Sequence, residues 1–184
     1  MIYGPLSQLL ALAALLLLPT ERLDIDAASA RMEVSGTSTV HDWSCAVESV
    51  TGWVNTDDSG DVASGAIQVP AGAIECGKRV MNRKLRDALR AEDHPVIEFR
   101  GERVVRRGDA LAVEGRLSVA GTTAEMTVPV EAVPEQSGYR LSGTVTLSLE
   151  ALNVDRPSAV LGTIKTGDEV TVSFSVLAIP GSAS

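Results

Sequence analysis

The feature that most constrains the fold is a two-residue alternation of apolar and polar side chains, which begins at Arg31. In the last such run the apolar positions are Val170, Val172, Phe174 and Val176. The polar positions between them are Thr171, Ser173 and Ser175. Successive side chains of a β-strand point to opposite faces, so this period gives one apolar and one polar face. The sequence therefore predicts half-buried antiparallel strands.

Eight segments carry this pattern or fit strands by composition. They are residues 31–40, 47–54, 63–69, 96–105, 111–119, 126–132, 141–149 and 170–176. Sequential pairing of that many strands removes exposed edges best by closing into a barrel. The predicted fold is therefore an all-β, eight-stranded antiparallel barrel, with a two-sheet sandwich as the alternative. Pro129 predicts a bulge or an edge in its strand, and glycines such as Gly101 and Gly115 predict bends or close backbone approaches.

One segment breaks the alternation and predicts a short α-helix over residues 79–91. Its apolar side chains recur at helical spacing, with Lys and Arg largely on the opposite side. The apolar positions are Val80, Met81, Leu85, Ala88 and Leu89. His94 precedes Pro95, and a residue before proline avoids the helical region, so the helix is expected to stop at this pair. We expect the helix to pack against one opening of the barrel.

Residues 1–30 predict a signal peptide or export segment. Leu9–Leu18 is an unbroken apolar run, too short for the roughly 20 residues of a membrane span and suited to a secretory signal. Ala28, Ser29 and Ala30 offer a small-residue cleavage site. The expected domains are this segment and a barrel over residues 31–184. The expected location is periplasmic or secreted, with no stable membrane span after processing.

The cysteine count agrees with export. Cys45 and Cys76 are the two cysteines of the chain, and an even number in an oxidising compartment indicates a disulfide. A metal or redox site is the competing interpretation. The pair lacks the C-x-x-C spacing, and no pair of histidines lies near it in the sequence. The sequence therefore predicts a disulfide between Cys45 and Cys76.

Charge and composition argue against nucleic acid as a partner. The net charge is −8, and aromatic residues make up 3% of the chain, so the platforms on which bases stack are scarce. The nearest candidate for a basic patch is the group Lys78, Arg79, Arg83, Lys84 and Arg86. Its simplest interpretation is the solvated face of the predicted helix.

The inventory of catalytic side chains is small. His41 and Asp42 are adjacent, but neighbouring residues of a strand point to opposite faces, so a shared catalytic role is disfavoured. A triad also needs a nucleophile, and the chain has no Gly-x-Ser-x-Gly elbow. His94 is expected to serve a turn. Two histidines without a carboxylate cluster make a zinc site improbable. We therefore predict no catalytic residues, no metal and no cofactor.

Six segments follow one another in an order that points to a family. They are Ser38–Trp43, Ile67–Pro70, Ala73–Cys76, Met81–Leu85, His94–Phe99 and Val113–Thr123. This order resembles the YceI-like family of lipid-binding periplasmic proteins. The resemblance implies an extended, lipocalin-like barrel of eight strands, whose elongated tunnel holds an isoprenoid-type chain. It also implies that the protein is not an enzyme.

The expected function is to bind or carry a long apolar ligand, a polyisoprenoid or another lipid, inside the barrel. The ligand-binding residues expected from the alternation are Ile67, Val69, Ile97, Phe99, Leu117, Met126, Val128, Val145, Leu147, Val172 and Phe174. Trp43 and Trp53 are candidates for closing an end, with core packing as the alternative. A ligand-free structural or protein-interaction barrel in the cell envelope is the competing function. A homodimer is compatible with the sequence.

Overall fold

The computed structural model describes residues 21–58, 60–107, 110–156, 158–159 and 164–181. Within these ranges it contains one α-helix, α1 (Arg79–Ala88), and one 3-10 helix, η1 (Ala71–Ala73). The remaining elements are strands: β1 (Arg22–Ile25), β2 (Arg31–Ser38), β3 (Trp43–Val47), β4 (Thr51–Thr56), β5 (Val62–Pro70), β6 (Ile74–Glu75), β7 (Val96–Arg107), β8 (Ala110–Val119), β9 (Thr122–Glu135), β10 (Gly138–Ser148), β11 (Ser158–Ala159) and β12 (Ile164–Pro180).

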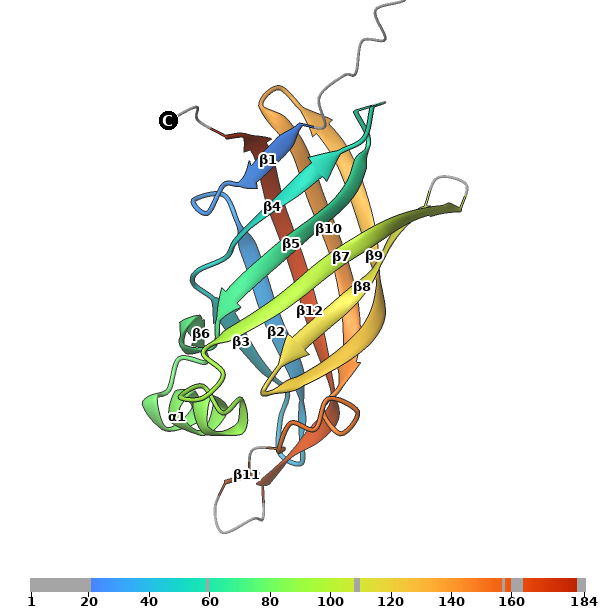
Figure 1. The fold of residues 1–184 in the computed structure, drawn as a ribbon. Coiled ribbons are helices and arrows are strands. Elements are labelled where there is room, and N and C mark those ends of the chain that lie inside the picture. The colour runs from blue at the N-terminus through green and yellow to red at the C-terminus, as the bar shows by residue number, and fades with distance from the viewer. Residues whose placement is uncertain (1–20, 59, 108–109, 157, 160–163, 182–184) are drawn as a thin grey trace, which may run out of the picture.

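The strands close into a barrel of eight, which confirms the predicted fold and excludes the sandwich (Figure 1). The ring runs β1, β4, β5, β7, β8, β9, β10 and β12, and the last residues of β12 pair with β1. Every pairing is antiparallel in the described residues. The earlier part of β12 pairs instead with β2, which leads through β3 to β6. We call the two ends of the molecule the β1 end and the α1 end.

The predicted strand over residues 47–54 is wrong in its boundaries. The structure places a break at residues 48–50, between β3 and β4. The two halves have different neighbours, because β3 pairs with β2 and β6 whereas β4 pairs with β1 and β5. At the break, the Glu48 N–H donates to the Ala73 carbonyl at 2.8 Å, and the side chain of Val50 is buried. The chain thus leaves one ladder and enters another.

Strand β1 falls in the segment that the sequence assigns to export. Its burial alternates, with Arg22 and Asp24 exposed and Leu23 and Ile25 buried in the core. It pairs with β4 on one side and with β12 on the other, so it closes the ring. The barrel therefore includes residues before Arg31. The apolar run Leu9–Leu18 lies outside the described residues, and export and cleavage stay predictions.

Glycines line up across three strands beside a shift in the β7–β8 register. Gly65 pairs with Gly101, and Gly101 pairs with Gly115. A Cβ atom on Gly115 would lie 2.1 Å from the Arg100 carbonyl oxygen, so no larger residue fits without moving the backbone. The β7–β8 register shifts immediately afterwards, between Gly101 and Arg103. The close approach expected at these glycines is therefore present.

Pro129 lies at the end of a ladder, as its missing N–H predicts. It pairs with Ala112 of β8 on one side. On the other side, the pairing between β9 and β10 runs from Glu135 only as far as Glu131, opposite Ser142. Pro129 thus lies two residues beyond the last pair of β9 with β10, where β9 has the edge-like position expected for a proline in a strand.

Helix α1 is three residues shorter than predicted. A residue in the left-handed conformation, Arg90, terminates it before the chain reaches His94 and Pro95. Arg90 has φ +49°, outside the helical range. The Arg90 N–H donates to the Asp87 carbonyl, and the Ala91 N–H donates to the Arg86 carbonyl, both at 3.0 Å. This is the Schellman arrangement, usually built on glycine, which satisfies the last carbonyls of a helix.

Candidate ligand cavity

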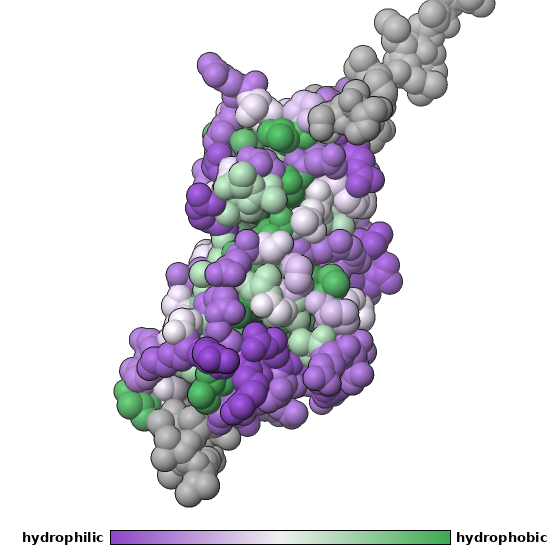
Figure 2. Space-filling view, turned by 90° about the vertical axis from the view of Figure 1, so that its left-hand side faces the viewer, coloured by the Kyte–Doolittle hydropathy of each residue, from purple (hydrophilic) through white to green (hydrophobic). Residues whose placement is uncertain are grey.

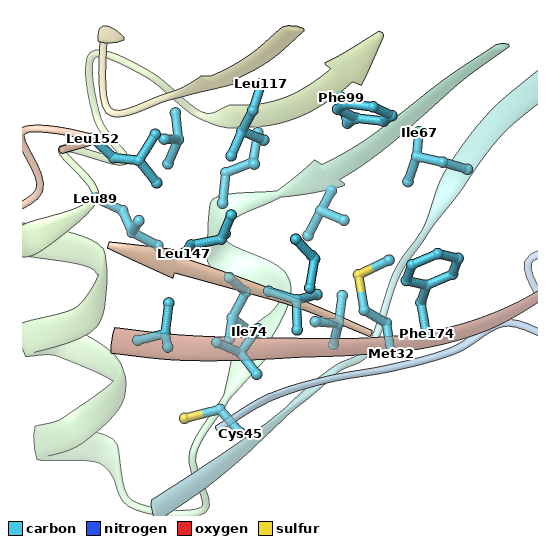
Figure 3. Close-up of a pocket in the computed structure, with 18 of the residues that line it drawn as sticks. Met32, Cys45, Ile67, Ile74, Leu89, Phe99, Leu117, Leu147, Leu152 and Phe174 are labelled. Atoms are coloured by element: carbon cyan, nitrogen blue, oxygen red, sulfur yellow. The ribbon is translucent and has the colours of Figure 1, made fainter. Parts of the chain in front are cut away.

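The barrel is hollow and contains a cavity of about 840 Å³. Most of the side chains that line it are aliphatic or aromatic. In Figure 3 the labelled side chains present carbon and sulfur to the space, from Leu89 and Leu152 at one end to Ile67, Phe99 and Phe174 toward the other. Small-molecule sites in proteins occupy about 300–1,000 Å³ and are lined mainly by apolar groups. The cavity therefore has the size and chemistry of a ligand site.

All eleven residues expected to bind the ligand lie on the cavity wall. They come from β5, β7, β8, β9, β10 and β12. That they contact a ligand stays a prediction. Met32 and Val34 of β2 also line the cavity, and they are not among the expected residues although they alternate with polar residues in the same way.

The pairing of β10 with β12 shows how alternation builds this wall. Val145 lies opposite Val172, and both side chains line the cavity. One residue away, Thr144 lies opposite Ser173, and their hydroxyl oxygens are 3.3 Å apart on the outer, exposed face. Neighbouring positions on the same two strands therefore face the apolar cavity and the solvent, respectively.

Helix α1 covers one end of the cavity, as the sequence predicts. Met81, Leu85, Ala88 and Leu89 line the space, while Val80 lines it at the margin and remains 57% exposed. Two residues missed as cavity residues, Leu152 and Val154, lie in the turn after β10, are buried and extend the apolar lining beside α1.

The beginning of α1 is attached to the barrel by a disulfide and by a buried amide. Cys45 of β3 and Cys76 are joined in a disulfide, as predicted, and both line the cavity. Asn82 is only 6% exposed. Its side-chain oxygen accepts the Cys76 N–H at 2.8 Å, and its amide nitrogen donates to the Glu75 carboxylate. The helix start is therefore held against β3 and β6.

The other end of α1 is attached by Arg90. Its guanidinium donates to the carbonyls of Ala120 and Asn153, each at 3.2 Å. Arg90, Ala120 and Asn153 all have positive φ angles, so one side chain joins three tight turns. The turn that contains Asn153 is also fixed by Asp168, which accepts the Ser148 hydroxyl at 2.7 Å and the Glu150 N–H at 2.9 Å.

These hydrogen bonds also set the charge state of Asp168. The Ser148 hydroxyl first, and the Glu150 N–H second, hold the pKa of Asp168 below its ordinary value of 3.8 because both stabilise the carboxylate. Asp168 does not line the cavity. Its role is to keep the turn after β10 in place while Leu152 and Val154 cover the apolar space.

The candidate catalytic residues are not assembled into a site. The Nδ1 atom of His41 lies 2.8 Å from the carbonyl oxygen of its neighbour Asp42, a local contact of the kind expected. The His94 ring packs beside Gly121 in the β8–β9 turn. The part of the chain that the structure describes holds no cluster of three or more side chains that could bind a metal.

The two tryptophans occupy different places. Trp43 lines the cavity near the α1 end, and its indole N–H donates to the Thr37 carbonyl at 3.1 Å. Trp53 does not line the cavity; the Arg22 guanidinium lies 5.0 Å from the centre of its ring. Of the two, only Trp43 therefore takes part in the cavity wall.

Three solved structures share this fold. BcnA of Burkholderia cenocepacia superimposes with a TM-score of 0.73 at 20% identity, covering 84% of this chain and 99% of that one. A polyisoprenoid-binding domain from Saccharophagus degradans, implicated in plant cell wall breakdown, gives 0.68 at 11% identity, with coverages of 89% and 100%. The YceI protein of Campylobacter jejuni gives 0.61 at 10% identity, with coverages of 73% and 84%.

A protein-family model matches most of the chain. The YceI-like domain matches residues 23–178, a range that starts in β1 and ends in β12. A search of curated proteins found no match. No helix in the described part of the chain is long and apolar enough to cross a membrane. The resemblance seen in the sequence is confirmed, and the chain belongs to the YceI-like family.

Proposed function

We propose that this protein binds and carries a single long apolar ligand, a polyisoprenoid or a similar lipid, inside the barrel. The observation that carries the proposal is the cavity of about 840 Å³ inside the barrel, with its apolar lining. Burial of hydrocarbon contributes roughly 0.8 kcal/mol for each CH₂ group removed from water, so a long chain gains most from such a space. The relative from Saccharophagus degradans is itself described as polyisoprenoid-binding.

We propose binding without catalysis. The groups facing the middle of the cavity are hydrocarbon side chains, which neither transfer protons nor attack a substrate. His41 is near the α1 end and is engaged with a backbone carbonyl. The competing function, a ligand-free structural barrel, is favoured by an interior filled with its own side chains. The hollow interior supports a carrier instead.

We further propose that the protein works in the periplasm or outside the cell. The disulfide between Cys45 and Cys76 supports an oxidising compartment. Cleavage after Ala30 would remove β1, whose buried side chains close the ring. We therefore place the cleavage site before Glu21 rather than at Ala30.

Filling the cavity is expected to abolish most ligand uptake. In Val145→Phe/Val172→Phe, two phenyl rings enter the space from facing positions of β10 and β12. Displacing about two CH₂ groups of the ligand, at about 0.8 kcal/mol each, weakens binding by about tenfold or more. Titration with a polyprenol, followed by displacement of a fluorescent fatty-acid probe, measures the change.

The matched control places the same rings on the outside. Thr144→Phe/Ser173→Phe alters the adjacent residues of the same strands on the exposed face. Its affinity for the polyprenol should equal that of the unmodified protein. Equal affinity of the cavity-filling variant, with its fold intact by circular dichroism, would contradict binding inside the barrel.

A further inference from the structure

The polar part of the cavity lining is concentrated at the α1 end. Its members there are Ser38, His41, Lys78, Arg79, Lys84 and Thr166. Lys78 is the residue before α1, Arg79 is the first residue of α1 and Lys84 lies in its middle. Ser38 and His41 come from the end of β2 and the turn after it, and Thr166 comes from the start of β12. Ser38 and Thr166 are also directly paired across β2 and β12. The rest of the lining is apolar apart from Ser64 and the glycines. The polar groups therefore form one mouth, where a headgroup can reach water.

The Lys and Arg side chains are the charged groups that line this mouth in the described part of the chain. Lys78 and Arg79 are exposed and Lys84 is half-buried, and all three line the cavity. Among the described residues no Asp or Glu lines it, although the whole chain has 24 acidic and 16 basic side chains. Figure 2, which turns the α1 side toward the viewer, shows strongly hydrophilic side chains gathered over this end. Solubility alone does not explain why cationic side chains gather at the mouth of a protein whose net charge is negative.

Packing of long side chains explains only part of the arrangement. Lys and Arg can lay their methylene stems on apolar surface and keep their charged heads in water. Glu can cover the same surface with a shorter stem, so packing alone does not select three cations and no anion. Binding of an anionic group would favour cations at all three positions. Charge-assisted hydrogen bonds to such a group are stronger where the mouth is partly dehydrated.

We propose that the mouth formed by Lys78, Arg79 and Lys84 recognises the anionic headgroup of the apolar ligand. The ligand is then an amphiphile with one long chain and a phosphate or carboxylate end. The headgroup stays at the α1 end while the chain runs between Leu117 and Leu147 toward Phe99 and Phe174. This inference rests on the proposed function, since it identifies the headgroup of the same ligand.

The test compares three probes that share one chain: geranylgeraniol, geranylgeranoic acid and geranylgeranyl monophosphate. Each is titrated by displacement of a fluorescent apolar probe at low and high salt. We expect the monophosphate to bind the unmodified protein about tenfold more tightly than the alcohol, because several partly exposed charges each contribute a few-fold. This preference should shrink at high salt, where exposed charges are screened.

The charge variants decide whether the mouth is responsible. Lys78→Gln/Arg79→Gln/Lys84→Gln should lose most of the preference for the monophosphate and keep its affinity for the alcohol. Arg83→Gln/Arg86→Gln is the matched control, because it removes two charges of the same helix that do not line the cavity. It should keep the preference. Binding of the acid as tight as that of the monophosphate would assign recognition to charge, and weaker binding would assign it to phosphate.

Two results would overturn the inference and leave the carrier function standing. One is equal affinity of the unmodified protein for the alcohol and both anionic probes. The other is loss of the preference in the control variant to the same extent as in the mouth variant. A failure of all three probes to bind would contradict the proposed function itself, and the inference with it.

Discussion

A chain that begins at Arg31 should be less stable than one that begins at Glu21 by about 3–6 kcal/mol. The truncation removes Leu23, which is 2% exposed, and Ile25, which is 8% exposed. Full burial of each such side chain contributes about 1.5–3 kcal/mol. Since a domain is stable by only about 5–15 kcal/mol in total, the shorter chain should unfold partly at room temperature. Urea denaturation followed by tryptophan fluorescence compares the two chains.

A matched pair of substitutions separates the loss of core from the loss of chain length. Leu23→Ala/Ile25→Ala changes the buried face of β1, and Arg22→Ala/Asp24→Ala changes the exposed face. Only the first should lower the free energy of unfolding by several kcal/mol. The intact mass of the exported protein should likewise show a mature chain that retains β1. A mature protein that starts at Arg31, or a truncated chain as stable as the longer one, would show that β1 is dispensable.

Removing the disulfide is the second change with a large expected effect. Cys45 and Cys76 are 31 residues apart, and a loop of that length lowers the entropy of the unfolded chain by the equivalent of about 3–4 kcal/mol. At about 2–4 °C for each kcal/mol, the melting temperature of Cys45→Ala/Cys76→Ala should fall by on the order of 10 °C. Differential scanning calorimetry measures the fall.

The same variant provides the control for chemical reduction. A reductant should lower the melting temperature of the unmodified protein toward that of the double variant and leave the variant unchanged. Thiol labelling of the unreduced exported protein should find neither cysteine free. Two reactive thiols in the unreduced protein would contradict a structural disulfide. A melting temperature that neither the double substitution nor the reductant lowers would contradict it as well. Cys45 is 1% exposed, so labelling is compared with and without denaturant.

Much of the barrel follows from alternation, because a strand with one dry and one wet face repeats its chemistry every two residues. That rule places Val145 and Val172 inside and Thr144 and Ser173 outside, as the structure has them. The disulfide follows from the count of cysteines together with the expected export. The resemblance to the YceI-like family, which the family model confirms, predicts how these strands and the helix combine into one barrel.

The features that the sequence reasoning missed depend on contacts between distant segments. Strand β1 is four residues long and follows an apolar run, so its alternation is too short to recognise alone. Asn82 is a polar residue that the helical pattern does not assign to either face, and its contacts with Cys76 and Glu75 explain its burial. Leu152 lies in a turn with no periodic pattern, and its burial depends on how α1 covers the cavity.

The end of α1 shows a conflict between local preferences and tertiary contacts. The predicted helix continues past Leu89 to residue 91, because Arg90 and Ala91 are both good helix formers. Arg90 instead takes a left-handed conformation that non-glycine residues seldom adopt. Its guanidinium reaches the Ala120 and Asn153 carbonyls in this arrangement. These two hydrogen-bond acceptors are 30 and 63 residues away in the sequence, so the residues around Arg90 do not predict them.

The most direct test of the central claim is native mass spectrometry of the protein purified from its own cells without detergent. We expect a bound adduct whose mass fits a long apolar chain, which organic extraction removes from the protein. The Val145→Phe/Val172→Phe variant from the same cells should carry much less of it, and Thr144→Phe/Ser173→Phe should carry as much as the unmodified protein. Repeated adduct-free spectra of the unmodified protein, together with no uptake of polyprenyl lipids in solution, would contradict a carrier of apolar ligands.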